Sequence, residues 1–250
     1  MTFKTLKHIL VIVPAFNEQN NVAEVVSEIA KSVPAADILV VDDGSYDKTR
    51  LKAISVGAKV VSHTFNLGYG AALETGYLYA IKKNYDFVLQ MDGDGQHLAS
   101  ELLKILSILE NNEADIVIGD RNDCDYSHSI FRKIGQKLFS TVVYLLSGFH
   151  ISDSTSGFQG LDKRSLRLFA SGLFPHDYPD ADVIMMSKFA GLRIKEVPVK
   201  MLNRIKGVSM HSGVKPLYYV FKMFLSLFIV RLNKRSLRRL SNQSEVSEEL

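Results

Sequence analysis

Residues 9–118 alternate between two patterns of apolar and polar positions. Short runs that are rich in β-branched residues, and apolar apart from a polar residue at some of their ends, occupy 9–13, 38–41, 59–61, 86–90 and 115–118. Their length predicts strands, and their lack of apolar–polar alternation predicts a sheet covered on both faces. Segments with helical spacing, such as 22–29 and 102–109, separate the runs. This alternation predicts an α/β fold in which helices flank a mostly parallel central sheet.

The residues that follow the five runs are polar or rich in glycine. They read PAFNE at 14–18, DDGS at 42–45, HTFNLGYG at 63–70, DGD at 92–94 and GDRN at 119–122. In a parallel sheet these ends share one edge, and ligands bind beyond it. Turn chemistry alone also produces polar loops. Carboxylates after three of the five runs favour a ligand site.

The second half of the chain alternates less regularly. Helical patterns cover 131–146 and 181–190, a loop with a short strand is expected near 153–158, and a strand is expected at 192–199. Pro198 favours an edge position for that last strand, because proline donates no ladder hydrogen bond. Residues 203–213 read as a basic loop. We therefore expect one domain over 1–213.

An apolar, aromatic segment follows this domain. Residues 217–230 are interrupted only by Lys222 and Ser226, and they fall short of the roughly 20 residues needed to span a bilayer. Five cations follow the segment at Arg231, Lys234, Arg235, Arg238 and Arg239. We expect an amphipathic helical tail over 214–239, either docked on an anionic membrane surface or packed on the core. Residues 240–250 are expected to be disordered.

Composition and charge narrow the class of protein. The chain has 250 residues, 46% of them hydrophobic, and its net charge of +3 is too small to favour nucleic acid. Its one cysteine, Cys124, excludes an internal disulfide and fits a reducing compartment. The apolar run at 9–13 is shorter than the core of a signal peptide. We expect a cytoplasmic protein.

The stretch LQMDGDGQH at 89–97 is the strongest candidate for metal chemistry. Asp92 and Asp94 lie two residues apart after a buried strand, and in an extended chain both point to one side. Adjacent carboxylates repel, which favours a cation between them. Gln96 offers a third oxygen, and hard oxygen ligands select Mg²⁺ or Mn²⁺. Gly93 and Gly95 leave room for a ligand.

Other interpretations of this stretch are weaker. An EF-hand requires glycine at its sixth place and glutamate at its twelfth, where this chain has His97 and Leu103. A plain turn remains open for DGDG alone, and the role of His97 is undefined. The chain lacks a Gly-x-Gly-x-x-Gly after the first strand and has no P-loop sequence.

PAFNE, DDGS, NLGYGAAL and DGDGQH, in this order, resemble the motifs of family 2 inverting glycosyltransferases of the GT-A fold, which is Rossmann-like. The resemblance covers residues 8–205. Within that family, DGDGQH is most similar to the branch of dolichol-phosphate mannose synthases and polyprenyl-phosphate glycosyltransferases. The resemblance implies that Asp92, Asp94 and Gln96 bind Mg²⁺ or Mn²⁺, and that a UDP- or GDP-sugar is the donor.

The same resemblance implies a donor site at the ends of the first two strands. Pro14, Ala15 and Glu18 would line the nucleoside pocket, with Glu18 reaching the ribose. Asp42 would meet the edge of the base, and Asp43 would support it. Both uracil and guanine are compatible with such a contact, so neither the base nor the sugar is defined.

Glycines and arginines complete the site implied by the resemblance. Gly68 and Gly70 would let the backbone approach the donor closely. Arg121 would neutralise phosphate, because a guanidinium binds two oxygens at once; a surface salt bridge is the alternative. Arg132 and Arg204 are further candidate phosphate ligands, and Arg204 begins an RIKGVS element similar to one on the acceptor side of relatives.

The acceptor determines whether a general base is needed. A hydroxyl acceptor requires one, whereas a polyprenyl phosphate is already an anion. Asp180 and Asp182, at the start of the predicted helix, are the candidate bases. They depart from the Glu-Asp pair of many relatives, and Asp180 could instead cap the helix.

We therefore expect a metal-dependent inverting glycosyltransferase that acts on polyprenyl phosphate. The leaving nucleoside diphosphate would be stabilised by the charge of the metal ion, which Asp94 and the other ligands bind, and by the charge of Arg121. One alternative is the same class with a saccharide hydroxyl acceptor, in polysaccharide or glycolipid assembly. Another is a degenerate nucleotide-binding scaffold for a membrane partner. The expected location is the cytoplasmic face of a membrane, where the protein would bind either the membrane surface or a small membrane protein.

Overall fold

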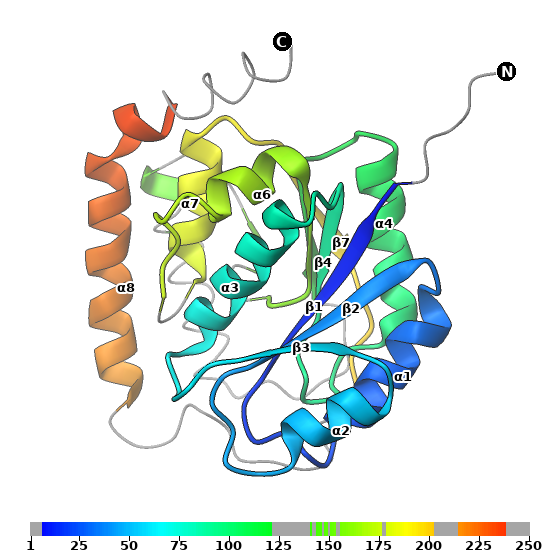
Figure 1. Ribbon diagram of the computed structural model, residues 1–250. Coiled ribbons are helices and arrows are strands. Elements are labelled where there is room, and N and C mark those ends of the chain that lie inside the picture. Colours follow the sequence, from blue (N-terminus) through cyan, green and yellow to red (C-terminus); the bar gives the residue numbers. More distant parts are fainter. Residues whose placement is uncertain are drawn as a thin grey trace, which may run out of the picture.

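A twisted sheet forms the centre of the molecule (Figure 1). The computed structural model describes residues 7–121, 141, 144–146, 148–149, 151–153, 156–176, 179–202 and 215–238, without the side chains of 215–221. The sheet has the order β3-β2-β1-β4-β6-β5-β7 within these residues. Its strands are β1 (Ile9–Ala15), β2 (Ala36–Asp42), β3 (Lys59–Ser62), β4 (Phe87–Gln90), β5 (Ile116–Asp120), β6 (Gln159–Asp162) and β7 (Ile194–Pro198).

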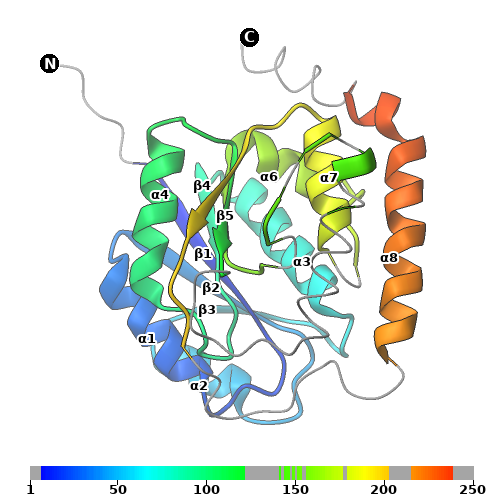
Figure 2. The same cartoon turned by 180° about the vertical axis from the view of Figure 1, so that it is seen from behind.

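Helices cover both faces of the sheet (Figures 1 and 2). One face carries α1 (Val22–Ser32), α2 (Thr49–Ser55) and α4 (Leu102–Glu110), the last preceded by a short 3₁₀ turn, η1 (Ala99–Glu101). The other carries α3 (Tyr69–Lys82), α6 (Lys163–Phe169) and α7 (Ala181–Phe189), with α8 (Lys215–Leu232) outermost beyond α7. The predicted α/β architecture is confirmed.

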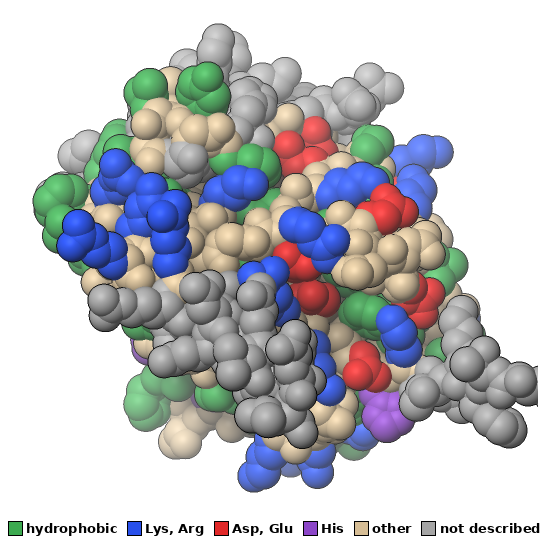
Figure 3. Space-filling view, turned by 90° about the horizontal axis from the view of Figure 1, so that it is seen from above, with side chains coloured by type: hydrophobic (Ala, Val, Ile, Leu, Met, Phe, Trp, Pro, Cys, Tyr) green, Lys and Arg blue, Asp and Glu red, His purple; other side chains and the backbone are tan. Residues whose placement is uncertain are grey.

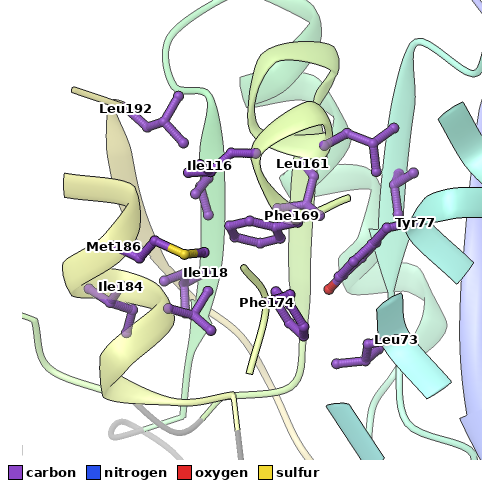
Figure 4. Close-up of a cluster of buried hydrophobic side chains, with 14 of the residues drawn as sticks. Leu73, Tyr77, Ile116, Ile118, Leu161, Phe169, Phe174, Ile184, Met186 and Leu192 are labelled. Carbon is purple, nitrogen blue, oxygen red and sulfur yellow. The ribbon is translucent and has the colours of Figure 1, made fainter. Parts of the chain in front are cut away.

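The strands explain why the apolar runs are unbroken. In β1, Leu10 and Ile12 pack into the cluster under α3, while Val11 and Val13 pack under α1 and α4. A strand buried on both faces needs apolar residues at successive positions. Figure 4 shows the α3 side of this core, where Tyr77 packs against Phe169.

The antiparallel strand β6 is the main departure from the predicted sheet. It lies between β4 and β5 and runs against both. It begins at Gln159, just beyond the loop where a strand was expected. Gly160 permits this position, because a Cβ there would lie 2.2 Å from Ile105 of α4. Since β6 opposes both neighbours, β4 and β5 run the same way, and the five predicted strands end at one edge.

Two predictions about the second half are also confirmed. The strand β7 pairs with β5 at the end of the sheet order, so Pro198 stands on an edge strand. The helix predicted for 181–190 corresponds to α7. Of the helix predicted for 131–146, only 141 and 144–146 are described, and they are helical. The tail at 240–250 lies outside the described residues.

The helix α8 has two apolar faces. Met223 and Leu227 are buried in the same cluster as α3 and α7, and Leu237 continues this face beyond the helix. The opposite face exposes large apolar side chains at Phe224, Leu225, Phe228, Ile229 and Leu232. Within the described part of the chain, no helix has the length and apolarity to cross a membrane.

Candidate active site

The loop after β4 brings two sequence motifs together. Asp92 leaves the carboxyl end of β4, and its side chain is 30% exposed. Asp92 Oδ1 accepts a hydrogen bond from the Tyr69 hydroxyl at 2.8 Å. A Cβ on Gly93 would lie 3.2 Å from the carbonyl oxygen of Pro14. The DGDGQH loop therefore rests directly on the PAFNE end of β1.

The chain does not stay extended through the two aspartates. It turns at Gly93 and Asp94, and Asp94 Oδ1 accepts a hydrogen bond from the Gln96 backbone N–H at 3.0 Å. The prediction that both carboxylates point to one side because the chain stays extended is therefore wrong. An aspartate that accepts from the amide two residues on stabilises a turn, so the loop is both a turn and a carboxylate site.

His97 lies behind this loop. Its ring is 2% exposed and lies 4.9 Å from the Phe158 ring, centroid to centroid. Its backbone pairs with Met201, and the Gln96 carbonyl accepts the Leu202 N–H. His97 thus packs inside the loop and ties it to the segment after β7.

The oxygen atoms of the loop fit a hard divalent cation. Asp92, Asp94 and Gln96 are all partly exposed at the sheet edge and offer carboxylate and amide oxygens. Among the described residues, no group of three or more His, Cys, Asp and Glu side chains could enclose a metal. Two carboxylates suit Mg²⁺ or Mn²⁺, whose remaining positions commonly take water and phosphate oxygens. They do not suit a closed zinc site.

Sequence reasoning missed a chain of polar side chains behind Asp92. The Tyr77 hydroxyl donates to Gln90 Oε1 at 2.6 Å, and Gln90 Nε2 donates to the Tyr69 hydroxyl at 3.1 Å. Burial, with the charge of Asp92, raises the pKa of Tyr69 well above its ordinary value. The available signal was Gln90 itself, a polar residue closing an apolar strand run immediately before the DGD motif.

Asp43 is enclosed by its own chain. Its carboxylate accepts hydrogen bonds from the backbone N–H groups of Leu67 and Gly68, both at 2.9 Å, and contacts His63 Nδ1 at 2.7 Å. The side chain is buried. Asp43 therefore fixes the loop after β3 against the end of β2, and its expected role in supporting the base stays a prediction.

Asp42 is also buried but is held differently. Its Oδ1 accepts from the Ser45 N–H at 3.1 Å, and its Oδ2 accepts from the Ser62 hydroxyl at 3.0 Å. The carbonyl oxygen of Ala15 accepts the Asp43 N–H at 2.9 Å. Hydrogen bonds thus join the ends of β1, β2 and β3 at the place where a nucleoside pocket was expected.

The PAFNE segment opens toward solvent after β1. Pro14 and Ala15 are buried in the strand, whereas Glu18 is partly exposed and accepts from the Asn21 side chain at 2.6 Å. Phe16 and Tyr46 are exposed, and their rings meet edge to face at 6.0 Å. An exposed aromatic pair stands beside the candidate nucleoside pocket, and sequence reasoning did not identify it.

The two glycines of the NLGYG loop have separate structural reasons. Gly68 has φ +103°, a backbone conformation that side chains rarely adopt. At Gly70, a Cβ would lie 2.2 Å from the carbonyl oxygen of Pro175 and 2.5 Å from that of His176. Close backbone approach at Gly70 is therefore already made by the chain's own 175–176 segment.

Arg121 forms a buried ion pair. Its Nε and Nη2 donate to the two carboxylate oxygens of Asp153 at 2.6 and 2.8 Å, and Asp153 is 0% exposed. Burial acts to lower the pKa of Arg121, but Asp153, helped by Asp92 and Asp180, raises it overall. The alternative of a surface salt bridge is wrong, because the pair is interior. The Arg121 guanidinium nevertheless interacts electrostatically with Asp92 of the DGDGQH loop.

The two candidate bases lie in different surroundings. Asp180 is partly exposed and makes no side-chain capping hydrogen bond, so the capping role considered for it is wrong. Asp182 is 1% exposed; it accepts the N–H groups of Asp180 and Val183 and the hydroxyl of Ser226 on α8. Burial raises the pKa of Asp182, and these donors partly offset the rise.

A pocket of about 230 Å³ lies beside Asp182. It separates the 175–176 segment from α8. Its lining is mostly apolar and comprises Pro175, His176, Asp182, Lys222, Met223, Leu225, Ser226 and Ile229. Arg132, Arg204 and the RIKGVS element lie outside the described residues.

The fold and site together define a GT-A glycosyltransferase. The sequence profile described as "Glycosyl transferase family 2" matches residues 10–169. The chain belongs to this family, as its motifs predicted.

Several relatives are similar over most of their length. The UDP-N-acetylglucosamine–dolichyl-phosphate N-acetylglucosaminyltransferase of Methanococcus voltae is 27% identical, over 91% of this chain and 98% of that protein. The polyprenol monophosphomannose synthase of Mycolicibacterium smegmatis is 29% identical, over 89% and 88%. The glucosyl-3-phosphoglycerate synthase of Mycobacterium tuberculosis, solved with Mn²⁺ and UDP-glucose, has the same fold; its TM-score is 0.68 at 20% identity, over 90% and 79%.

Proposed function

We propose that this glycosyltransferase moves a sugar from a nucleotide-sugar donor to a polyprenyl phosphate, with a divalent cation. The observation that carries the proposal is the contact of the DGDGQH loop with the end of β1, beside the loop that Asp43 fixes. That arrangement puts hard metal ligands next to a nucleoside pocket. The lipid acceptor is supported by two relatives that act on dolichyl or polyprenol phosphates.

On the donor side, different residues bind the nucleoside, position the adjoining loop and bind the metal. Glu18 and Asp42, with the backbone at Pro14 and Ala15, bind the nucleoside, and Asp43 keeps the adjoining loop in place. Asp92, Asp94 and Gln96 would hold the Mg²⁺ or Mn²⁺, which would supply positive charge to the departing diphosphate. Gly93 keeps the loop close to β1.

The reaction is a single displacement with inversion. An oxygen of the lipid phosphate forms a bond to the anomeric carbon while that carbon's bond to the diphosphate oxygen breaks. The leaving nucleoside diphosphate gains negative charge, and the buried Arg121 adds a positive field from the side of the metal loop. We propose Arg132 and Arg204 as further phosphate ligands. An anionic acceptor needs no general base, which agrees with the enclosed position of Asp182 between α7 and α8.

One observation favours a second acceptor class. Asp180 is partly exposed and lies within electrostatic reach of Arg121. In that position it could deprotonate a saccharide hydroxyl. An Asp180→Asn variant separates the two cases: transfer to lipid phosphate persists if no base is needed, whereas a hydroxyl acceptor requires the carboxylate.

The outer face of α8 is the proposed membrane contact. Five large apolar side chains line this face. Figure 3 shows Lys and Arg side chains gathered over the end of the molecule where α8 terminates. An apolar face flanked by cations suits an interfacial helix on an anionic leaflet, as at the cytoplasmic face of a membrane. We propose that residues 214–239 act as this contact, with lipid or with a small membrane protein.

Donor identity is tested by thermal shift. The chain is heated with UDP, GDP, dTDP or CMP, each with and without Mn²⁺. A ligand that binds the folded state raises Tm, and the rise grows with the logarithm of its concentration divided by its Kd. We expect one nucleoside diphosphate to raise Tm, and Mn²⁺ to enlarge the rise. A nucleotide that raises Tm equally with and without Mn²⁺ would instead support a degenerate nucleotide-binding scaffold.

A further inference from the structure

Resting on the proposed function of Asp92 as a metal ligand, we propose that Tyr69 is the positioning residue that holds this carboxylate for the metal. Tyr69 lies within the NLGYGAAL motif, where the family resemblance implied roles only for Gly68 and Gly70. Tyr69 is the first residue of α3, and its hydroxyl lies 2.8 Å from Asp92 Oδ1. The proposal depends on which way that hydroxyl points its single proton.

The surrounding hydrogen bonds determine the direction of the proton. The Gly157 carbonyl oxygen can only accept, so the atom of Gln90 that lies 2.9 Å from it must be the amide nitrogen. The same nitrogen lies 3.1 Å from the Tyr69 hydroxyl oxygen, which therefore accepts from Gln90. On the other side of that amide, the Tyr77 hydroxyl donates to Gln90 Oε1 at 2.6 Å. The Tyr69 proton is left to point at Asp92.

The position of Tyr69 is itself fixed by the donor side of the site. It follows Leu67 and Gly68, whose backbone N–H groups are bound by Asp43. Gly68 turns the chain with φ +103° directly before the tyrosine. Tyr69 thus connects the loop at the nucleoside pocket to the carboxylate at the metal site. A carboxylate that accepts from a fixed donor loses rotational freedom, so less ordering accompanies metal binding.

The close approach of Gly157 adds an independent constraint. A Cβ there would lie 2.6 Å from the Tyr69 hydroxyl and 2.9 and 3.1 Å from the two carboxylate oxygens of Asp92. Only glycine lets the tyrosine and the aspartate meet at this point. A Gly157→Ala variant therefore displaces the pair without removing either partner, and it perturbs the same contact as Tyr69→Phe by another route.

The chain also offers a matched control. Tyr85 donates to Asp37 Oδ2 at 2.5 Å, which is the same chemistry as at Tyr69. That pair lies at the opposite edge of the sheet, where β2 and β4 begin. Tyr85→Phe thus removes one tyrosine-to-aspartate hydrogen bond from the fold and leaves the metal loop untouched.

The test measures Mn²⁺ binding to the full chain, by following the electron paramagnetic resonance signal of free Mn²⁺. Loss of a partner that orients a metal ligand typically weakens affinity about 10- to 100-fold. We expect that loss for Tyr69→Phe and Gly157→Ala, complete loss for Asp92→Asn, and wild-type affinity for Tyr85→Phe. In transfer assays, Tyr69→Phe should raise the Mn²⁺ concentration needed for half-maximal rate while kcat at saturating Mn²⁺ changes little.

The outcomes separate this inference from the proposed function. Wild-type Mn²⁺ affinity in Tyr69→Phe, with binding abolished in Asp92→Asn, overturns the role of Tyr69 and leaves the metal site standing. Equal weakening in Tyr69→Phe and Tyr85→Phe also overturns it, because the effect would then come from general loss of stability. Unchanged binding in Asp92→Asn, or no binding by the wild type, overturns both.

Discussion

The loop after β4 and the start of α7 each bring an aspartate to the candidate site, but the two carboxylates meet opposite surroundings. Asp92 is partly exposed and receives a hydroxyl donor from Tyr69. Asp182 is enclosed between two helices and receives donors from its own backbone and from Ser226. Asp92 is partly exposed at the sheet edge, whereas Asp182 connects α7 to α8 and also lines the pocket of about 230 Å³.

The difference teaches that an acidic residue near a site is not evidence of a catalytic role. Both residues were candidates on their place in the sequence. Burial and hydrogen-bond partners distinguish the carboxylate that we propose binds a cation, Asp92, from the carboxylate that connects two helices, Asp182. The mutations below test this separation, beginning with the largest expected effect.

The Asp92→Asn variant should lose the most activity. Removing a carboxylate that holds the metal forfeits several kcal/mol of transition-state stabilisation, so the transfer rate should fall by about 1,000-fold or more. Asp182→Asn keeps the shape of the buried side chain and should keep most of the wild-type rate. The measurement is kcat/KM for both variants with the same donor. A larger loss in Asp182→Asn would reverse the comparison and favour a hydroxyl acceptor.

Asp153 sharpens the comparison with a third carboxylate, one that is buried and paired with a cation. Asp153→Ala leaves the Arg121 guanidinium buried without this partner. We expect the free energy of unfolding to fall by about 3–5 kcal/mol, measured by urea denaturation. Lys195→Ala, which removes an exposed ion pair with Glu113, serves as the control and should change stability little. Similar small effects in both variants would contradict an interior role for the Asp153 pair.

The two faces of α8 provide a test within the helical flank. Leu227→Ala empties a buried position and should lower the free energy of unfolding by about 2–5 kcal/mol. Phe228→Glu, on the exposed face, should leave stability nearly unchanged but reduce binding to anionic phospholipid vesicles in sedimentation assays. Unaltered vesicle binding in Phe228→Glu would refute the proposed membrane face.

The smallest effect is the pH dependence contributed by Asp182. Its folded-state pKa is raised by burial, so the folded chain binds this proton more tightly than the unfolded chain does. Asp182 therefore adds stability that is fully present below its unfolded pKa of about 4 and is lost as pH rises through the raised folded value. The stability advantage of wild type over Asp182→Asn should be greatest at low pH. An advantage that grows with pH would contradict a raised pKa for this buried carboxyl.

The arrangement of strands and helices could be predicted from the sequence because each element has its own spacing of apolar residues. The five apolar runs became five strands with a common carboxyl edge, and the motifs after them came together there. The antiparallel position of β6 was not predictable locally, since it depends on Gly160 fitting against α4. The turn at Gly93–Asp94 was one of the alternatives left open for DGDG, and the hydrogen bond from the Gln96 N–H to Asp94 stabilises it.

The site was only partly predictable for a related reason. DGDGQH and PAFNE can be recognised as motifs in the sequence. Tyr69, Gln90 and Gly157, in contrast, act through contacts between segments that are distant in the sequence. Asp182 shows the converse: its position in the sequence suggested a general base, which stays a prediction, while its contact with Ser226 of α8 could not be seen in the sequence. Long-range contacts, rather than residue type, decide such cases.

The central claim is transfer to a lipid phosphate, and the most direct test compares two acceptors that differ only in that phosphate. The wild-type chain is incubated with Mn²⁺, the labelled nucleotide sugar identified by thermal shift, and either polyprenyl phosphate or the corresponding polyprenol. We expect chloroform-soluble label with the phosphate only, and none with Asp92→Asn. Label transferred to polyprenol or to a saccharide, with none on polyprenyl phosphate, would contradict the account.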